Sequence, residues 1–195
     1  MSASLPPLLV DIPRNPFLAV GIPVTLGVAT GLVTRTSSKS PESLWYKSLA
    51  RPKWEPPRWA FGVVWPLLYI AMGVSSHLTV KALDRTPPGL GRTRAMNALK
   101  LYYAQLALNQ LWTPLFFGAG QITISFANLS ALLGTIAVWG WTLKDVDERA
   151  AILTVPYLAW SAYATALNGF IWWKNSGKPF FGALRDRANE KKKGN

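Results

Sequence analysis

The stretch that most constrains the fold of this chain is residues 49–73, LARPKWEPPRWAFGVVWPLLYIAMG, which begins with cations and prolines and ends as an apolar run. Pro56 and Pro57 cannot lie in the interior of a helix, because proline lacks an N–H and clashes with the preceding turn, but they can begin one. A helix is therefore expected to begin near Arg58. The apolar run continues to residue 80, and its length of about 20 residues is what crossing a bilayer requires.

Four further apolar runs of similar length occur along the chain, and nearly all charges fall in the segments between them. This distribution argues against a soluble domain and predicts an all-α integral membrane protein, a five-transmembrane-helix bundle. The transmembrane domain is expected at residues 16–173, with helices at about 16–34, 58–80, 95–117, 122–143 and 151–173. A frayed N-terminal tail, 1–15, and a basic C-terminal tail, 174–195, are expected to flank it.

Composition excludes several classes of function. The chain has no Cys and a single His, and no acidic residue lies inside any apolar run, so neither a disulfide, a thiolate metal site nor a metal-ligand cluster is expected. The sequence contains no paired carboxylates, Gly-rich phosphate loop or nucleophile motif, and no cofactor is predicted. The net charge of +12 is typical of basic loops that face anionic lipid, and no basic module for nucleic acid is present.

Two of the expected helices carry aromatic and polar side chains along one face. Trp65 and Tyr69 are one turn apart on the second helix, and Gln105, Asn109 and Trp112 recur at helical spacing on the third. An indole, phenol or amide in hydrocarbon needs a hydrogen-bond partner. Neighbouring helices can supply that partner, in which case these residues join the helices, or a bound ligand can, in which case they line a pocket.

Residues 35–58 form a loop that is long enough to fold over one end of the bundle. Its aromatic side chains alternate with cations, a pattern typical of the lipid headgroup interface. The alternative interpretation is a lid that closes a pocket at the membrane surface.

One long motif in the chain resembles the signature of a known family. Residues 45–59 read W-Y-x-x-L-x-R-P-x-W-x-P-P-x-W, and residues 64–73 read V-W-x-x-L-Y-x-x-M-G. Both strings resemble the translocator protein family (TspO/MBR), also called tryptophan-rich sensory proteins or peripheral-type benzodiazepine receptors. The segments QLALNQLWTPLFFG, residues 105–118, and PYLAWSAYATALN, residues 156–168, extend the resemblance to the third and fifth helices.

The resemblance implies a five-helix bundle that binds flat hydrophobic ligands between its helices, beneath the first loop. Ligands of the family include porphyrins such as protoporphyrin IX, synthetic benzodiazepine and isoquinoline carboxamide drugs, and sterols in animal members. The positions that match the family motifs imply a set of ligand-binding residues: Trp65, Trp160, Asn109, Tyr69, Trp112, Ala164, Tyr46, Pro56 and Pro57.

Three functions remain open at this point. The first is a membrane receptor or carrier for tetrapyrroles and other flat hydrophobic ligands, linked to tetrapyrrole or sterol handling. The second is an enzyme that degrades porphyrin with light and oxygen, as proposed for some bacterial relatives, using the pocket tryptophans. The third is a structural bundle or channel, which the absence of an intramembrane ring of charges disfavours.

The chain departs from the family pattern at particular positions. Animal members carry a Tyr after the Leu-Asn pair of the fifth helix for sterol binding, and here Gly169 follows Asn168. The third helix has Lys100 where members often have a small residue for dimer packing, which shifts a homodimer seam to the small-xxx-small pair Gly27 and Gly31. That pair is equally compatible with packing inside one chain. The long hairpin and tails suggest a eukaryotic protein of the outer mitochondrial membrane, with another endomembrane as the alternative.

Overall fold

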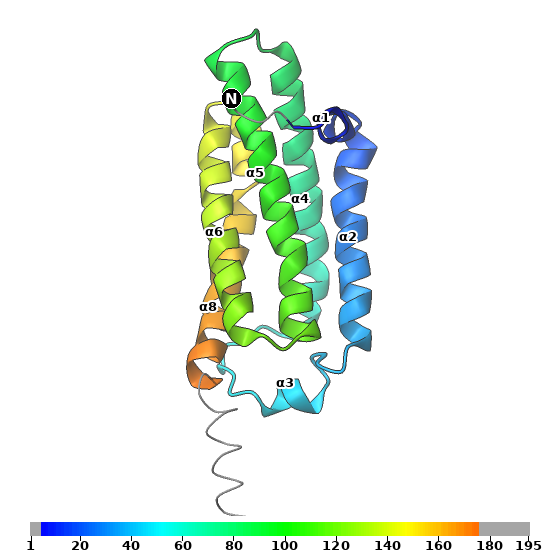
Figure 1. Ribbon diagram of the computed structural model, residues 1–195, viewed down its shortest axis with the longest axis vertical. Helices are drawn as coiled ribbons and strands as arrows, with labels where there is room; N and C mark the ends of the chain where they lie inside the picture. Colours follow the sequence, from blue (N-terminus) through cyan, green and yellow to red (C-terminus); the bar gives the residue numbers. More distant parts are fainter. Residues whose placement is uncertain (1–4, 176–195) are drawn as a thin grey trace, which may run out of the picture.

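The computed structural model describes residues 5–175, and over that range the chain is helical with no strand (Figure 1). From residue 176 on, the basic C-terminal tail lies outside the described residues. Five long helices lie side by side and form an elongated bundle. They are α2 (Pro16–Thr36), α4 (Arg58–Arg85), α5 (Leu90–Thr113), α6 (Ile122–Lys144) and α8 (Val155–Asn175).

Four segments are long and apolar enough to cross a membrane: α2, α4, α6 and the segment Glu148–Asn175, which contains α7 (Glu148–Ile152) and α8. Helix α5 has 24 residues but does not reach the hydropathy of the other four. The reason is its first half, which carries Arg92, Arg94 and Lys100. The expectation of an α-helical membrane bundle is therefore met, with four apolar spans and a more polar fifth helix packed among them.

The helices begin and end where local chemistry requires. The side chain of Asn15 caps α2 by accepting hydrogen bonds from the backbone N–H groups of Phe17 and Leu18, at 2.9 and 3.3 Å. Pro57 directly precedes α4, as its fixed φ favours. Helix α5 begins at Leu90 rather than near residue 95, directly after Gly89, whose φ of 149° is open mainly to glycine. A π-helical turn, η1 (Pro114–Gly118), follows α5.

The expectation of a frayed N-terminal tail is wrong for residues 7–14. They form the helix α1 (Pro7–Arg14), which lies at the edge of the bundle next to the beginning of α2 and against α4 (Figure 1). Three side chains hold it there. His77 donates from Nδ1 to the Pro13 carbonyl at 2.7 Å, the Tyr103 hydroxyl donates to the Leu9 carbonyl at 2.7 Å, and Arg14 pairs with Asp84 at 2.7 Å. Pro7 lies in the first turn of α1, where proline is tolerated, and Pro13 lies near its end.

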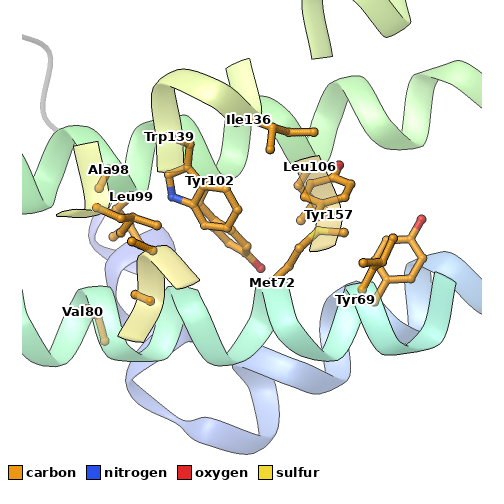
Figure 2. Packing of buried hydrophobic residues seen from close by; sticks show 14 of the residues in the cluster. Tyr69, Met72, Val80, Ala98, Leu99, Tyr102, Leu106, Ile136, Trp139 and Tyr157 are labelled. Atoms are coloured by element: carbon orange, nitrogen blue, oxygen red, sulfur yellow. The ribbon is translucent and has the colours of Figure 1, made fainter. Parts of the chain in front are cut away.

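The core of the bundle lies between α4, α5, α6 and α8. Figure 2 shows Met72 of α4 facing Tyr102 of α5 and Trp139 of α6, with Tyr157 of α8 nearby. The rings of Tyr102 and Trp139 have centroids 5.8 Å apart. Trp139 and Tyr157 are fully buried. In this arrangement aromatic side chains, rather than aliphatic ones alone, fill the centre of the bundle.

Helix α2 approaches α4 closely because Gly73 has no side chain. A Cβ at Gly73 would lie 2.4 Å from the carbonyl oxygen of Ala19. Gly27 of α2 likewise faces the ring of Tyr69, so this glycine serves packing within the chain, whereas a Cβ at Gly31 would meet nothing within 4 Å. The homodimer interpretation of this small-residue pair therefore rests on Gly31 alone and stays a prediction.

Candidate functional site

A buried hydrogen-bond network joins α4, α5 and α8 at the centre of the predicted site. The Tyr69 hydroxyl donates to Asn109 Oδ1 at 2.7 Å, and Asn109 Nδ2 donates to the Tyr157 hydroxyl at 3.0 Å. The Tyr157 hydroxyl in turn donates to Gln105 Oε1 at 2.8 Å. Gln110 extends the network, because its Nε2 donates to the Tyr69 hydroxyl at 3.2 Å. In this structure Asn109 and Gln105 join helices, since neighbouring phenols occupy their amide groups.

We expect Asn109→Ala to lower the free energy of unfolding by about 2 kcal/mol, because it removes two buried hydrogen bonds and deprives both tyrosine hydroxyls of a partner. Thermal unfolding in detergent, followed by near-UV circular dichroism, measures the change. Asn97→Ala on the exposed face of α5 is the matched control, since no hydrogen bond of its side chain appears among the described residues. Equal unfolding temperatures for the two variants would contradict a structural role for Asn109.

The predicted tryptophans lie around the same core, each on a different helix. The Trp65 ring packs on Tyr69, with centroids 5.7 Å apart, and the Trp112 indole donates to Asn168 Oδ1 at 3.0 Å. Trp160 lies between Phe61 and Tyr163, at centroid distances of 5.6 and 5.7 Å. Its Nε1 atom is buried and has no hydrogen-bond partner among the described residues. An unpartnered indole N–H in an apolar setting is available to an acceptor that enters from outside.

The first loop crosses the end of the bundle opposite α1 and carries the short helix α3 (Leu44–Ser48) (Figure 1). Tyr46 of α3 is buried against Phe116 and Phe117, at centroid distances of 6.2 and 5.7 Å. Its hydroxyl donates to Glu55 at 2.6 Å, and the Arg51 guanidinium lies 4.8 Å from its ring centroid. Burial, together with the Glu55 carboxylate, raises the pKa of the Tyr46 hydroxyl well above its ordinary value, so the group stays a donor.

The second half of the loop is fastened to α8. Trp54 packs on Tyr163 with centroids 5.5 Å apart, and the Tyr163 hydroxyl donates to the Trp54 carbonyl at 2.6 Å. The Asn175 side chain forms two hydrogen bonds with the backbone of Ala50, at 3.0 and 3.1 Å. These contacts attach the loop to α8 at two places along the helix. The loop thus covers this end of the bundle in the structure.

The structure brings most of the predicted site residues together. Six of them belong to one core cluster or pack against it: Trp65, Tyr69, Asn109, Trp112, Trp160 and Ala164. Tyr46 belongs to a second cluster with Phe116, Leu167 and Ile171, and Trp112 packs against both clusters. Pro56 and Pro57 precede α4 and belong to neither cluster.

The sequence argument missed Phe61, Tyr163 and Trp54 as neighbours of the site. Tyr163 follows Trp160 by three residues and so shares its face of α8, which is a signal that could have found it. Two cavities of about 230 and 390 Å³ lie at the α1 end of the bundle, and none of the nine predicted residues lines them. The aromatic side chains of the candidate site pack against one another instead.

Comparison with known proteins agrees with the motifs and the fold. The family model described as TspO/MBR family matches residues 19–174. The translocator protein of Ovis aries is 43% identical over 134 residues, covering 69% of this chain and 76% of the relative, and that of Homo sapiens is 42% identical over 133 residues, covering 68% and 76%. A tryptophan-rich sensory protein of Cereibacter sphaeroides is 36% identical over 145 residues, covering 74% and 85%. With its apolar helices and its signature at residues 45–73, this chain belongs to the TspO/MBR family of membrane proteins.

Proposed function

We propose that the protein is a membrane receptor or carrier that binds porphyrins, such as protoporphyrin IX, between α4 and α8 beneath the first loop. The observation that carries the proposal is the Trp160 indole N–H, which is buried beside Phe61 and lacks an acceptor among the described residues. A ligand oxygen or nitrogen would satisfy it. Trp65 and Ala164 pack against the same core and would form the rest of the wall, with the small Ala164 leaving room beside the ring.

A row of aromatic rings on α8 and the first loop favours a flat aromatic ligand over a compact one. From Trp160 the ring contacts continue through Tyr163 and Trp54 to Phe170 and Trp173, with successive centroids between 5.5 and 6.3 Å apart. Three of these four contacts are edge-to-face, so the row offers ring edges as well as ring faces to a large π system. Other flat hydrophobic ligands, sterols among them, would use the same faces.

A cation stands at the end of this row. Lys174 Nζ lies 4.0 Å from the Trp173 ring centroid, and it pairs with no carboxylate within residues 5–175. A porphyrin carries propionate groups on one edge, and these would be attracted to a lysine at the membrane surface. The row therefore offers aromatic contacts along its length and a charge partner at its end.

Ligand entry requires the first loop to move. Ligand pockets for molecules of this size have volumes of about 300–1,000 Å³, and here the rings of Trp160, Phe61 and Tyr163 pack directly on one another. Displacing the Trp54 ring and carbonyl from Tyr163 would open the space next to Trp160. In this proposal the loop acts as a lid, and its contacts with α8 have to break before a ligand enters.

Titration with protoporphyrin IX in the dark tests the proposal. We expect saturable quenching of Trp fluorescence by wild-type protein in detergent, and about tenfold weaker affinity for Trp160→Phe, which keeps a ring but loses the N–H donor. Trp141→Phe is the control, because Trp141 is 72% exposed near the other end of α6. Absence of saturable quenching, or equal affinity of both variants, would overturn the site.

Illumination of the same samples in air separates a carrier from the alternative, a porphyrin-degrading enzyme. A carrier leaves the porphyrin absorption band to decay at the rate of free porphyrin. Faster decay that requires Trp160 would assign degradation instead.

We also propose the outer mitochondrial membrane as the location, with another endomembrane as the alternative. Support comes from the similarity to translocator proteins of animals and to a translocator protein homolog of Schizosaccharomyces pombe, 40% identical over 126 residues. Fractionation with an outer-membrane marker tests it.

A further inference from the structure

A cavity of about 390 Å³ lies at the α1 end of the bundle, between the last turns of α4 and the connection from α6 to α7. Cations dominate its charged lining, with a single carboxylate among them. Its lining residues are Leu78, Lys81, Ala82, Arg85, Thr86, Val146, Asp147 and Arg149. The porphyrin proposal assigns no role to this place, which is remote from the first loop.

The cavity has a fixed frame. The Ser75 hydroxyl of α4 donates to the Ala150 carbonyl of α7 at 3.0 Å, and both groups are buried. This bond holds α4 against α7 just before the cavity begins along α4. Lys81 and Arg85 follow on α4, four residues apart, so they lie on one face of the helix. The two cations are therefore presented together on one wall.

The single carboxylate in the cavity is already neutralised. Asp147 Oδ1 accepts from the backbone N–H groups of Arg149 and Ala150, at 3.0 and 3.2 Å, and Oδ2 accepts from the Arg149 guanidinium at 3.0 Å. Burial opposes its ionisation, but the hydrogen bonds from Arg149 and Ala150 outweigh burial and lower the pKa of Asp147. Asp147 thus stays an anion bound to its own cap, and it does not neutralise the α4 cations.

Lys81 and Arg85 have no anionic or hydrogen-bonding partner among residues 5–175, unlike the arginines around them. Arg14 pairs with Asp84, Arg94 pairs with Asp145 at 3.2 Å, and Arg92 donates to two backbone carbonyls. For Lys81 and Arg85, no hydrogen bond or ion pair of the side chain appears among residues 5–175. Two adjacent cations without an anion, at the mouth of a cavity, are suited to an anionic ligand with several acceptor oxygens.

The expected depth of the cavity in the membrane favours a ligand from the lipid headgroup layer. Helix α4 has 28 residues and is about 42 Å long, whereas the hydrocarbon core is about 30 Å thick. Its last turns therefore reach the headgroup layer. At the same end of the bundle Lys144 lies over the exposed ring of Trp141, 4.5 Å from its centroid, an arrangement typical of the membrane interface. Leu78 and Val146 give the cavity an apolar side.

We propose that this cavity binds the phosphate of an anionic phospholipid headgroup, with Lys81 and Arg85 as its direct partners and Arg149 at the rim. Basic pockets between membrane helices are known to bind anionic lipid headgroups. Soluble phosphate has the same chemistry, so the test must separate a lipid from a free ion. The site is independent of the porphyrin proposal, and its variants leave porphyrin affinity unchanged.

Native mass spectrometry of detergent-purified protein tests the site with dioleoylphosphatidylglycerol, with dioleoylphosphatidylcholine and with sodium phosphate as a competitor. The test variant is K81Q/R85Q. The control is K47Q/K53Q, which removes the same charge from exposed positions in the first loop. We expect wild type to prefer the anionic lipid, the test variant to bind it about tenfold more weakly, and the control to behave as wild type.

Each outcome decides the proposal. If millimolar phosphate displaces the lipid from wild type but not from K81Q/R85Q, the cavity is a phosphate site that also accepts the free ion. Equal weakening of both double variants means a net-charge effect and overturns the site, as does a wild type that binds both lipids equally. Unfolding temperatures of the two variants, which change exposed side chains only, confirm that both are folded.

Discussion

Gly73→Ala is expected to lower the free energy of unfolding by about 3 kcal/mol, because the added methyl group would meet backbone of α2. The new Cβ would lie 2.4 Å from the Ala19 carbonyl oxygen and 2.6 Å from the Val20 Cα, so it meets backbone that no rotamer change can move. Relief requires α2 to shift away from α4, and overpacking of this kind costs about 1–3 kcal/mol or more. Thermal unfolding in detergent would show a decrease of about 5–10 °C.

The matched control for this substitution is Gly31→Ala. Gly31 lies on the exposed face of α2, and a Cβ there meets nothing within 4 Å. The same change of residue type therefore adds a methyl group without a clash, and we expect the unfolding temperature to stay the same or rise, since alanine favours helix. If both variants lose stability equally, the close approach of α2 and α4 at Gly73 is not what limits substitution.

A lid that cannot open is expected to slow porphyrin association by about 100-fold or more, because apparent binding falls with the fraction of open protein. The chain has no Cys, so an Ala50→Cys, Asn175→Cys double variant carries the only two thiols. These positions contact each other through the Asn175 side chain and the Ala50 backbone. Stopped-flow quenching of Trp fluorescence measures association before and after oxidation.

Reduction of the bridge is the internal control, since it restores an unlinked loop in the same protein. Association should then recover and exceed the wild-type rate, because the variant has lost both hydrogen bonds between loop and α8. If the oxidised and reduced forms bind at the same rate, porphyrin enters by a route that does not involve the first loop. That result would leave the Trp160 test unaffected and would remove the lid from the proposal.

Local chemistry explains which parts of the fold could be predicted from the sequence. Apolar runs identify long helices, and Pro57 marks the beginning of α4, because these signals act within a few residues. Helix α1 was missed because its stability depends on His77 and Tyr103, which belong to other helices. The early start of α5 at Leu90 is a second case. Its first half is polar, and packing against neighbouring helices stabilises it rather than its own hydropathy.

In the candidate site, too, contacts within one helix could be predicted from the sequence, whereas contacts between helices could not. The proximity of Trp65 and Tyr69 follows from helical spacing and could be predicted. The sequence left open whether Asn109 joins helices or binds a ligand, because the answer depends on Tyr157, which lies 48 residues further on. The unpartnered indole N–H of Trp160 is likewise visible only in three dimensions, because it depends on which side chains surround the ring in the folded bundle.

The position of α1 has a consequence for how the bundle is oriented in the bilayer. Helix α1 lies next to the beginning of α2, and the Trp141–Lys144 pair lies near the end of α6; Figure 1 shows α2 and α6 at opposite sides of the bundle. Interfacial anchors on opposite sides of a bundle would limit the tilt of its long axis in the bilayer. If that end anchors the bundle, the first loop at the other end is not needed as an anchor. Its side chains can exchange their contacts with α8 for contacts with a ligand while the helices keep their tilt.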